Sequence, residues 1–339
     1  MRALVTGAAG FVGSHLSEAL LDTGAEVIGV DAFTDYYARA RKEANVAPLM
    51  SRDRFRLVEA DLADAELAPL LDGVDHVFHL AGQPGVRASW GAEFHDYTRH
   101  NITATQRLLE ACRRTRPRKL VYASSSSVYG DAEAYPTAET LRPQPVSPYG
   151  VTKLAGEYLC EVYRRGFGLR TASLRLFTVY GPRQRPDMAF SRLVQSAVRG
   201  EQFVVFGDGQ QTRDFTFVGD VVAAMLAAAS SDWCGVANIG GGSRTSLNEA
   251  LDIVAHMCGE LNLVHRRVAR GDVRHTAADT MVAAAAFGYF PSTTLSQGLA
   301  AMVAWERAGQ ADRSHVVELP EQDRKAAQAE RPQRTELVG

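Results

Sequence analysis

The first 180 residues alternate short apolar runs, rich in residues that favour β-strands, with stretches that have a helical pattern. The apolar runs read RALVTG, EVIGVD, FRLVEAD, DHVFHLAG, RKLVYASS and LRTASLRLF. The helical stretches between them include residues 11–22, 94–114 and 147–165. The runs are apolar enough to be buried on both faces, and strands that alternate with helices form parallel sheets with helices on both sides. The sequence therefore predicts an α/β fold with a doubly wound parallel sheet over residues 1–180.

The regular alternation ends after Gly181. Helical patterns and short strands follow at less regular spacing, in residues 192–200, 213–217, 218–230, 235–240 and 246–259. We expect residues 181–307 to form a smaller α/β lobe, with segments near 213–240 returning to the first domain. Residues 308–339 are polar and charged with few large apolar side chains, which predicts a tail with little fixed structure.

Composition narrows the class of protein. Over 339 residues, 46% hydrophobic and 22% charged residues suit one large or two modest globular units with an ample core. A formal net charge of −2 gives no sign of binding to nucleic acid or to a membrane surface, although local arginines could still form an anion site. No stretch reaches the roughly 18 consecutive apolar residues that a membrane-spanning helix needs.

The cysteines and the start of the chain indicate the compartment. Cys112, Cys160, Cys234 and Cys258 form no CxxC pair and have no close histidine partner. An oxidising compartment would allow two disulfides, but a chain of this size needs no such cross-links. The opening segment MRALVTGAAGFVG reads as structure and not as a signal peptide. We therefore expect reduced cysteines and a cytoplasmic protein.

Glycines at three-residue spacing lie between the first strand and the first helix. The segment VTGAAGFVG contains Gly7, Gly10 and Gly13, followed closely by helical residues. Glycine permits the tight turn, the approach of the backbone to a pyrophosphate, and close packing of helix against strand. The amide groups at the start of the helix, at Phe11 and Val12, then favour phosphate. This pattern predicts a Rossmann-type dinucleotide site.

The second strand ends in an acid that bears on the choice of dinucleotide. Asp31 lies eighteen residues past Gly13. A carboxylate there can accept hydrogen bonds from the adenosine ribose hydroxyls and would repel a 2′-phosphate, which favours NAD over NADP. Arg39 and Arg41 are nearby cations and leave NADP open as the alternative.

The segment SPYGVTK places Tyr149 and Lys153 four residues apart, on one face of a predicted helix. A phenol with a pKa of about 10 is a poor base at neutral pH. A neighbouring ammonium and a nicotinamide cation would stabilise the phenolate and lower that pKa. Tyr149 could then remove a proton from a substrate hydroxyl while hydride leaves the same carbon for NAD+.

These features together resemble the extended short-chain dehydrogenase/reductase family, specifically its nucleotide-sugar epimerase branch. The resemblance runs from Met1 to roughly Trp305 and implies a Rossmann domain followed by a lobe that binds a UDP-sugar. It implies a catalytic role for Ser125, three residues before VYG, and a hydrogen bond from Lys153 to the nicotinamide ribose. It also implies cofactor contacts from Asp61 and Leu62 beside the adenine, and from Ala81, Gly82 and Gln83. Family members commonly dimerise through two helices from each subunit, here residues 94–114 and 147–165, so a homodimer with a four-helix interface is expected.

Four hydroxyl side chains in succession, in SSSSVYG, end the fifth predicted strand. In the related sugar 4,6-dehydratases, the two residues before VYG are Asp and Glu, which eliminate water; here they are Ser126 and Ser127. Neither serine can act as such an acid–base pair, so dehydration is not expected. A cluster of hydroxyl donors instead suits a carboxylate, although both serines could simply be satisfied hydroxyls at a strand end.

The segment FTVYGPRQRPDMAF resembles the signature of UDP-glucuronate 4-epimerases. Galactose-type epimerases usually have Asn where this chain has Thr178, a further hydroxyl that could contact a carboxylate at C5 of the sugar. By the same resemblance, Arg185 would serve the UDP or the carboxylate end. The remaining expected substrate contacts, to the sugar, the uracil, the ribose and the diphosphate, come from Arg87, Phe206, Gln211, Arg213 and Arg274.

The resemblance implies NAD-dependent C4 epimerisation of UDP-glucuronate to UDP-galacturonate through a 4-keto intermediate. UDP-glucuronate decarboxylation and 4-epimerisation of neutral UDP-hexoses such as UDP-glucose are the alternatives with the same fold and cofactor. A regulatory binder without chemistry is the alternative from another class, and retention of both Tyr149 and Lys153 argues against it. His76 and His79 lie three apart, but with no third ligand in view we expect no metal site.

Overall fold

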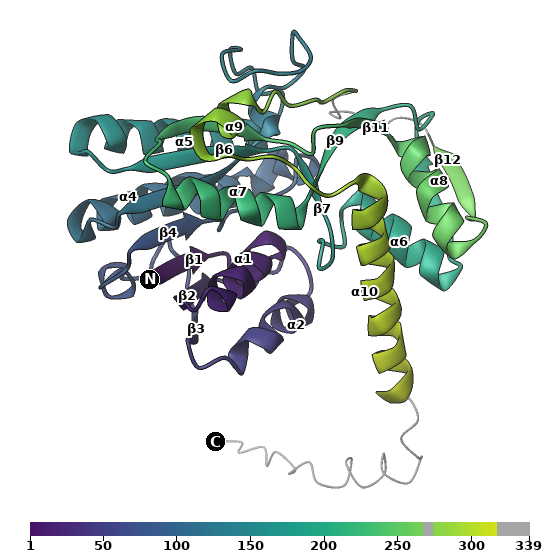
Figure 1. Cartoon of the computed structure of the whole chain (residues 1–339), viewed down its shortest axis with the longest axis horizontal. Coiled ribbons are helices and arrows are strands. Elements are labelled where there is room, and N and C mark those ends of the chain that lie inside the picture. Colours follow the sequence, from purple (N-terminus) through teal and green to yellow (C-terminus); the bar gives the residue numbers. More distant parts are fainter. Residues whose placement is uncertain (267–273, 317–339) are drawn as a thin grey trace, which may run out of the picture.

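A parallel sheet of seven strands forms the centre of the first domain (Figure 1). The computed structural model describes residues 1–266 and 274–316. Along the sheet the order is β10-β6-β5-β4-β1-β2-β3, and every neighbouring pair is parallel. The strands are β1 (Arg2–Thr6), β2 (Glu26–Asp31), β3 (Phe55–Glu59), β4 (His76–His79), β5 (Lys119–Ser125), β6 (Thr171–Leu176) and β10 (Gly235–Ile239).

The strand order reverses next to β1, because β2 and β3 lie on one side of it and β4, β5 and β6 lie on the other. From β1 the chain goes to β2 and β3 on one side, and it then crosses back to β4 on the other side. Connections on the two sides of β1 therefore run in opposite directions, and a crevice opens beyond the carboxyl ends of the strands at this point. The predicted doubly wound parallel sheet is confirmed. β3 departs from the expectation of burial on both faces, since it is the edge strand and its side chains are partly exposed.

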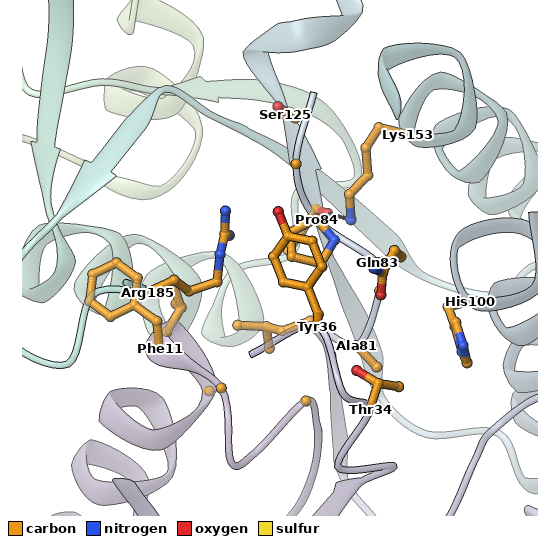
Figure 2. A pocket seen from close by; sticks show the side chains of 18 of the residues that line it. Phe11, Thr34, Tyr36, Ala81, Gln83, Pro84, His100, Ser125, Lys153 and Arg185 are labelled. Atoms are coloured by element: carbon orange, nitrogen blue, oxygen red, sulfur yellow. Dashed lines mark hydrogen bonds between the residues drawn. The ribbon is translucent and has the colours of Figure 1, made fainter. Parts of the chain in front are cut away.

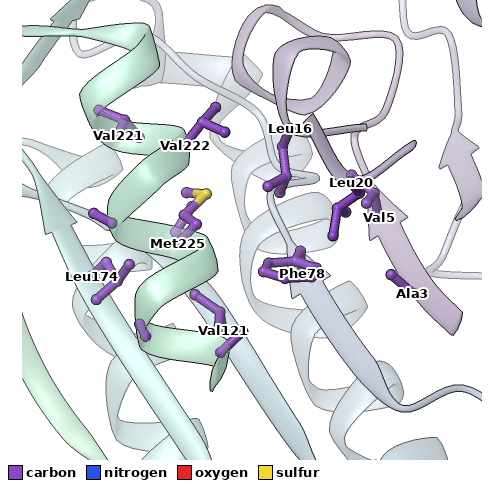
Figure 3. Close-up of a cluster of buried hydrophobic side chains, with 14 of the residues drawn as sticks. Ala3, Val5, Leu16, Leu20, Phe78, Val121, Leu174, Val221, Val222 and Met225 are labelled. Carbon is purple, nitrogen blue, oxygen red and sulfur yellow. The ribbon is translucent and has the colours of Figure 1, made fainter. Parts of the chain in front are cut away.

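Helices cover both faces of the sheet. Successive residues of a strand point to opposite faces, so Ala3 and Val5 of β1 belong to one buried cluster and Leu4 to the other. The first cluster, drawn in Figure 3, packs four helices on one face: α1 (Phe11–Asp22), α2 (Arg39–Met50), α7 (Val218–Ser230) and α9 (Met281–Phe287). The second packs α4 (Ala104–Thr115) and α5 (Pro148–Phe167) on the other face.

The predicted helix over residues 94–114 is continuous but not uniform. It comprises α3 (Phe94–Tyr97), a π-helical segment η4 (Thr98–Thr103) and α4. π-helical turns are rare and occur frequently at functional sites. The short 3-10 turns of the structure are η1 (Ala68–Leu70), η2 (Arg87–Ser89), η3 (Gly91–Glu93) and η5 (Ser126–Val128).

A second, smaller lobe follows residue 181 and has a buried cluster of its own, in which Tyr180, Phe190 and Leu251 take part. Its helices are α6 (Ala189–Arg199), α8 (Leu247–Cys258) and α10 (Leu295–Val316). A three-stranded sheet joins β7 (Thr178–Tyr180), β9 (Thr212–Phe217) and β11 (Arg244–Ser246), and β8 (Phe203–Phe206) pairs with β12 (Leu263–Arg266). The strand β10 and the helix α7, which fall between these elements in sequence, belong to the first domain.

Helix α10 continues to Val316, so residues 308–316 are helical where the composition predicts little fixed structure. Ala, Arg and Gln favour helix, and extension of an existing helix requires no new nucleation. Residues 317–339, the rest of the predicted tail, lie outside the described residues. Within the described part of the chain, no helix combines the length and the apolar character that crossing a membrane would require.

Candidate active site

A cavity of about 430 Å³ lies beyond the carboxyl ends of β1, β2, β4 and β5, in the crevice that the strand order creates (Figure 2). All the residues predicted for catalysis and cofactor binding line it, and four predicted for the substrate line it with them. They are Gly7, Gly10, Phe11, Val12, Gly13, Asp31, Asp61, Leu62, Ala81, Gly82, Gln83, Ser125, Ser126, Ser127, Tyr149, Lys153, Thr178 and Arg185.

The turn between β1 and α1 has the geometry of a phosphate-binding loop. Gly7 adopts a positive φ of 71°, and its amide donates to the carbonyl of Val30 at 2.7 Å. A Cβ atom on Gly13 would lie 2.1 Å from the carbonyl oxygen of Gly7, so α1 can approach β1 this closely only with glycine there. The start of α1 has no side-chain cap and no acidic residue in its first turn, which leaves its amide groups for an anion.

Asp31 fits the ribose end of a dinucleotide. Its carboxylate accepts the amide of Ala9 at 3.0 Å and that of Phe33 at 2.8 Å, which fixes it at the rim of the cavity. The guanidinium of Arg39 is held by the carboxylates of Glu43 and Glu59, at 2.8 Å and 2.6 Å. Because the guanidinium is already bound to two carboxylates, it is a poor partner for a 2′-phosphate. The carboxylate of Asp31 would also repel a 2′-phosphate. The residues present therefore fit NAD.

Tyr149 and Lys153 lie in the first two turns of α5, which begins at an N-cap where the Ser147 hydroxyl accepts the Gly150 amide at 3.1 Å. Burial raises the pKa of Tyr149, and a hydrogen bond with Ser125 and the charge of Arg185 act against that increase. The Lys153 ammonium donates to the carbonyl of Ala123 at 2.9 Å. Burial lowers the pKa of Lys153 to about 8.

Arg185 is a cation near Tyr149 that the sequence analysis does not place there. The sequence assigns stabilisation of the phenolate to Lys153 and a nicotinamide cation, and this stays a prediction; in the structure the charge of Arg185 and a hydrogen bond with Ser125 oppose the increase in the Tyr149 pKa that burial causes. Spacing of four residues puts Lys153 on the same face of the helix as Tyr149, yet its ammonium turns to the end of β5. The charge of Arg185 acts on the phenol from a loop that is remote in sequence, which helical spacing could not reveal.

The four serines at the end of β5 all line the cavity, and the first of them is also bonded to the core. Ser124 donates its hydroxyl to the buried carboxylate of Glu157. Ser125 accepts the amide of Ser127 at 3.1 Å and turns the chain into η5. The turn leaves Ser126 and Ser127 at the cavity wall, which Thr178 from β7 also lines. The structure thus brings together the three hydroxyls that the sequence predicts around a carboxylate.

Arg185 reaches the cavity from the loop before α6. Its guanidinium forms two hydrogen bonds of 3.0 Å to the carboxylate of Asp187 and lies 5.7 Å from the ring centre of Tyr36 (Figure 2). The Tyr36 hydroxyl donates to the same carboxylate at 3.3 Å. Tyr36 lies in the loop after β2 and Asp187 in the loop before α6, so this contact joins the two lobes across the cavity.

Five of the expected substrate residues form a second group outside the lining of this cavity. The Arg87 guanidinium lies 5.4 Å from the ring centre of Phe206, and the Gln211 side chain donates to the carbonyl of Phe206 at 3.2 Å. Arg213 donates to the carbonyl of Arg274 at 3.1 Å. Because Arg87 follows the cavity-lining segment 80–86, this group lies next to the cavity and could receive the distal half of a long ligand.

Asn101 and Tyr36 are site residues that sequence reasoning missed. Asn101, in the π-helical segment, accepts the amide of Gln83 at 2.7 Å and donates to its carbonyl at 3.0 Å and to the Thr152 hydroxyl at 2.9 Å. It thereby ties the cavity-lining loop after β4 to α5. A π-helical turn has no simple sequence pattern, and a tyrosine in a polar loop looks like an ordinary surface residue. The sequence therefore gives no signal for either Asn101 or Tyr36.

The histidines of β4 and the described residues as a whole offer no metal site. His79 is buried between the hydroxyls of Thr6 and Thr105, at 2.8 Å and 2.9 Å, and burial lowers its pKa to about 3. His79 is therefore a neutral core residue. No group of three possible metal ligands occurs among the described residues.

Comparison with known families and curated proteins finds one matching family model and similar epimerases. The model of the family described as "NAD dependent epimerase/dehydratase family" matches residues 3–240. The Bacillus subtilis (strain 168) protein named Uncharacterized UDP-glucose epimerase YtcB is 45% identical over 310 residues, which cover 90% of this chain and 98% of that protein. UDP-glucuronate 4-epimerase 1 of Arabidopsis thaliana is 38% identical over 327 residues, covering 89% and 76% respectively.

A solved structure of similar fold was determined with two ligands. The crystal structure of UDP-glucuronic acid 4-epimerase from Bacillus cereus, in complex with UDP-glucuronic acid and NAD, superposes with a TM-score of 0.87. The two sequences are 41% identical, and the match covers 91% of this chain and 99% of that one.

The close approach at Gly13 leads to a test of the dinucleotide site. In Gly13→Ala the added methyl group must push α1 away from Gly7, so NAD affinity measured by calorimetry should fall by about tenfold or more, equivalent to about 1.4 kcal/mol. Gly166→Ala, where a Cβ meets nothing within 4 Å, is the matched control and should bind NAD normally. Equal affinity in the two variants would contradict this geometry.

Proposed function

The chain belongs to the NAD dependent epimerase/dehydratase family, and we propose that within it the chain is a UDP-glucuronate 4-epimerase. It binds NAD and interconverts UDP-glucuronate and UDP-galacturonate at C4. The 41% identical Bacillus cereus enzyme, solved with UDP-glucuronic acid and NAD, supports both the substrate and the cofactor.

One observation carries this choice: the cavity wall presents three hydroxyl groups and a guanidinium, and the nearby carboxylate of Asp187 is already bound to that guanidinium. Ser126, Ser127 and Thr178 supply the hydroxyls and Arg185 the cation. The two carboxylates that line the cavity, Asp31 and Asp61, belong to the part that fits the cofactor. Hydroxyl and guanidinium donors suit a carboxylate ligand, which acidic side chains at the same place would repel.

In the proposed reaction Tyr149 removes the proton from the C4 hydroxyl of the sugar. The hydrogen bond with Ser125 and the charge of Arg185 favour the phenolate, and Ser125 also aligns the C4 oxygen. Lys153 contributes its positive charge and its hydrogen bonds near the cofactor ribose. NAD, when bound, supplies a hydride acceptor that later returns the hydride. Ser126, Ser127, Thr178 and Arg185 hold the C5 carboxylate while the C4 ketone of the sugar exists.

The nucleotide half of the substrate lies over the second lobe in this proposal. Arg213 and Arg274 bind the diphosphate and ribose, since planar guanidinium groups suit phosphate oxygens, and Arg87 lines the sugar site. Phe206 and Gln211 contact the uracil. We propose the corresponding division into a cofactor domain (residues 1–180 with the returning segments near 213–240) and a UDP-sugar lobe (residues 181–307).

We further propose a homodimer formed through α5 and the helix over residues 94–115. The support is an unpartnered apolar stripe on α5, where Val151, Tyr158 and Val162 are 48%, 60% and 60% exposed. These residues lie seven and four apart, on one face of the helix. An exposed apolar stripe of this kind favours a protein interface. A cytoplasmic location agrees with the free thiols of the four cysteines.

Product analysis is the direct test of the proposed activity. Purified protein with catalytic NAD and UDP-glucuronate should give a product of unchanged mass that chromatography identifies as UDP-galacturonate, and Tyr149→Phe should abolish it. Loss of CO2 would instead show a decarboxylase. UDP-glucose is the necessary second substrate, because YtcB is named for it and the same hydroxyls could bind a C6 alcohol. Turnover of UDP-glucose alone would overturn the proposal.

Thr178 provides a test of the carboxylate site. A ketone at C4 makes the sugar a β-keto acid, which loses CO2 when the bond to the carboxylate aligns with the carbonyl π system. Loss of one hydroxyl in Thr178→Ala should loosen that carboxylate and raise the UDP-pentose side product, measured by mass spectrometry. Thr178→Ser keeps the hydroxyl and should remain clean. A Thr178→Ala variant that epimerises without added UDP-pentose would contradict the role of Thr178 in holding the carboxylate.

The proposed interface is testable by light scattering. The wild-type mass should be about twice the 36.8 kDa of one chain, and a charge on the apolar stripe, in Tyr158→Asp, should halve it. Phe290→Asp places the same charge at a residue that is 73% exposed and lies outside both helices, so it should leave the dimer intact. A monomeric wild type, or a dimeric Tyr158→Asp, would contradict the interface.

A further inference from the structure

We propose that Glu157 is a positioning residue for Lys153: its buried carboxylate compensates the lysine ammonium and fixes the strand end that carries Ser125. Glu157 touches neither the cavity nor, in the proposed function on which this inference rests, any reacting atom. Its influence on the reaction would pass through Lys153 and through β5.

Glu157 is one helical turn beyond Lys153 in α5 and lies on the same face. Only 3% of it is exposed. Its Oε1 accepts Arg175 Nε at 2.9 Å, and its Oε2 accepts Arg175 Nη2 at 2.8 Å. The Ser124 hydroxyl donates to the same carboxylate. One carboxylate therefore connects α5 with both β5 and β6.

Lys153 and Glu157 hold adjacent residues of β5. The ammonium of Lys153 donates to the carbonyl of Ala123 at 2.9 Å, and the carboxylate of Glu157 accepts the hydroxyl of Ser124. The next residue is Ser125, whose hydroxyl bonds with Tyr149. Two opposite charges from one helix thus fix two successive residues and thereby the orientation of the third.

Among the groups that face Lys153, the carboxylate of Glu157 is the charge partner of its ammonium. From β5, the Tyr122 ring centre lies 5.2 Å from the ammonium. From β4, His79 is neutral, since burial lowers its pKa to about 3. From α5 itself come Cys160 and Glu157, and both act on Lys153 in favour of the charged form. Among these residues Glu157 is the carboxylate.

Arg175 and Arg185 complete the charges on the other elements. Arg175, on β6, is 4% exposed and faces Glu157, with its guanidinium 4.6 Å from the ring centre of Tyr129. Arg185 belongs to the loop before α6 and is paired with Asp187. Two buried cations, Lys153 and Arg175, therefore share one buried anion.

This arrangement has a consequence with a defined sign. Burial already lowers the pKa of Lys153 to about 8, and the charge of Glu157 opposes that decrease. Removing the carboxylate must lower the pKa further, so the ammonium would lose its proton at a lower pH. Removing the Arg175 charge takes away a like charge, so the pKa of Lys153 should rise as long as Glu157 stays ionised. A merely structural ion pair would produce neither shift.

The test measures Lys153 directly by lysine-selective 13Cε NMR. The chain has four lysines, Lys42, Lys119, Lys153 and Lys325, so the spectrum is simple, and Lys153→Arg assigns the signal. In Glu157→Gln the titration midpoint should fall by about one unit or more, and in Arg175→Gln it should rise. The alkaline limb of kcat for the epimerase should move in the same directions.

Controls separate this role from stability alone. Glu306 is 3% exposed and pairs with Arg199 at 2.9 Å in the second lobe, so Glu306→Gln removes a comparable buried carboxylate remote from Lys153. It should lower the melting temperature without moving the Lys153 midpoint. Glu157→Asp keeps the charge and should restore most of the wild-type midpoint.

An unchanged midpoint in Glu157→Gln, or a downward shift in Arg175→Gln, would overturn the proposal. If Glu157→Gln does not fold, Arg175→Gln and Glu157→Asp still decide it by the sign of their shifts. The NMR titration needs no sugar substrate. A protein that shows the expected midpoints but does not turn over UDP-glucuronate would refute the proposed function and leave the role of Glu157 intact.

Discussion

The parallel direction of the seven central strands is the constraint on which the site depends. Because every pair is parallel, the carboxyl ends of β1, β2, β4 and β5 meet at one edge of the sheet. Gly7 follows β1, Asp31 ends β2, and Ser125 ends β5. A reversal of any of these strands would carry its functional residue to the opposite edge. The reversal of strand order next to β1 then opens the crevice in which these residues face a common cavity.

The sequence predicts the fold and the first domain well, because the spacing of apolar residues and the residue types in turns are local properties of the chain. The apolar pattern gives α1 and α7 with the bounds that the structure has, and the glycine spacing locates the phosphate turn. Contacts between remote segments are not encoded in local patterns. Arg185 beside Tyr149 and the clamp by Asn101 both depend on how loops pack in three dimensions. The prediction of an unstructured tail from residue 308 was wrong up to Val316 for another reason: composition cannot distinguish a polar helix extension from an unstructured tail.

Buried charge in this protein is organised in pairs. Arg185 is paired with Asp187, Arg175 with Glu157, and Lys153 lies one turn from that second carboxylate. A buried charge without a partner costs several kcal/mol, so each cation near the site requires an anion close by, and Lys153 and Arg175 share Glu157. The pairs also keep the cations charged, and charged neighbours are what Tyr149 needs if its phenol is to act as a base. Stability and catalysis thus make the same demand on these side chains.

The sugar end of the cavity combines three hydroxyls with an arginine that is already neutralised by Asp187. For a reaction in which the sugar must turn within the site between the two hydride transfers, this balance has a physical rationale. An unpaired guanidinium would fix a carboxylate with two parallel hydrogen bonds and resist the rotation. Hydroxyl groups donate single hydrogen bonds and rotate freely about their own bonds, so they can follow the carboxylate as it moves. In the proposed function the paired arginine would supply attraction without rigid capture, unlike the arginine of a site built to hold a carboxylate still.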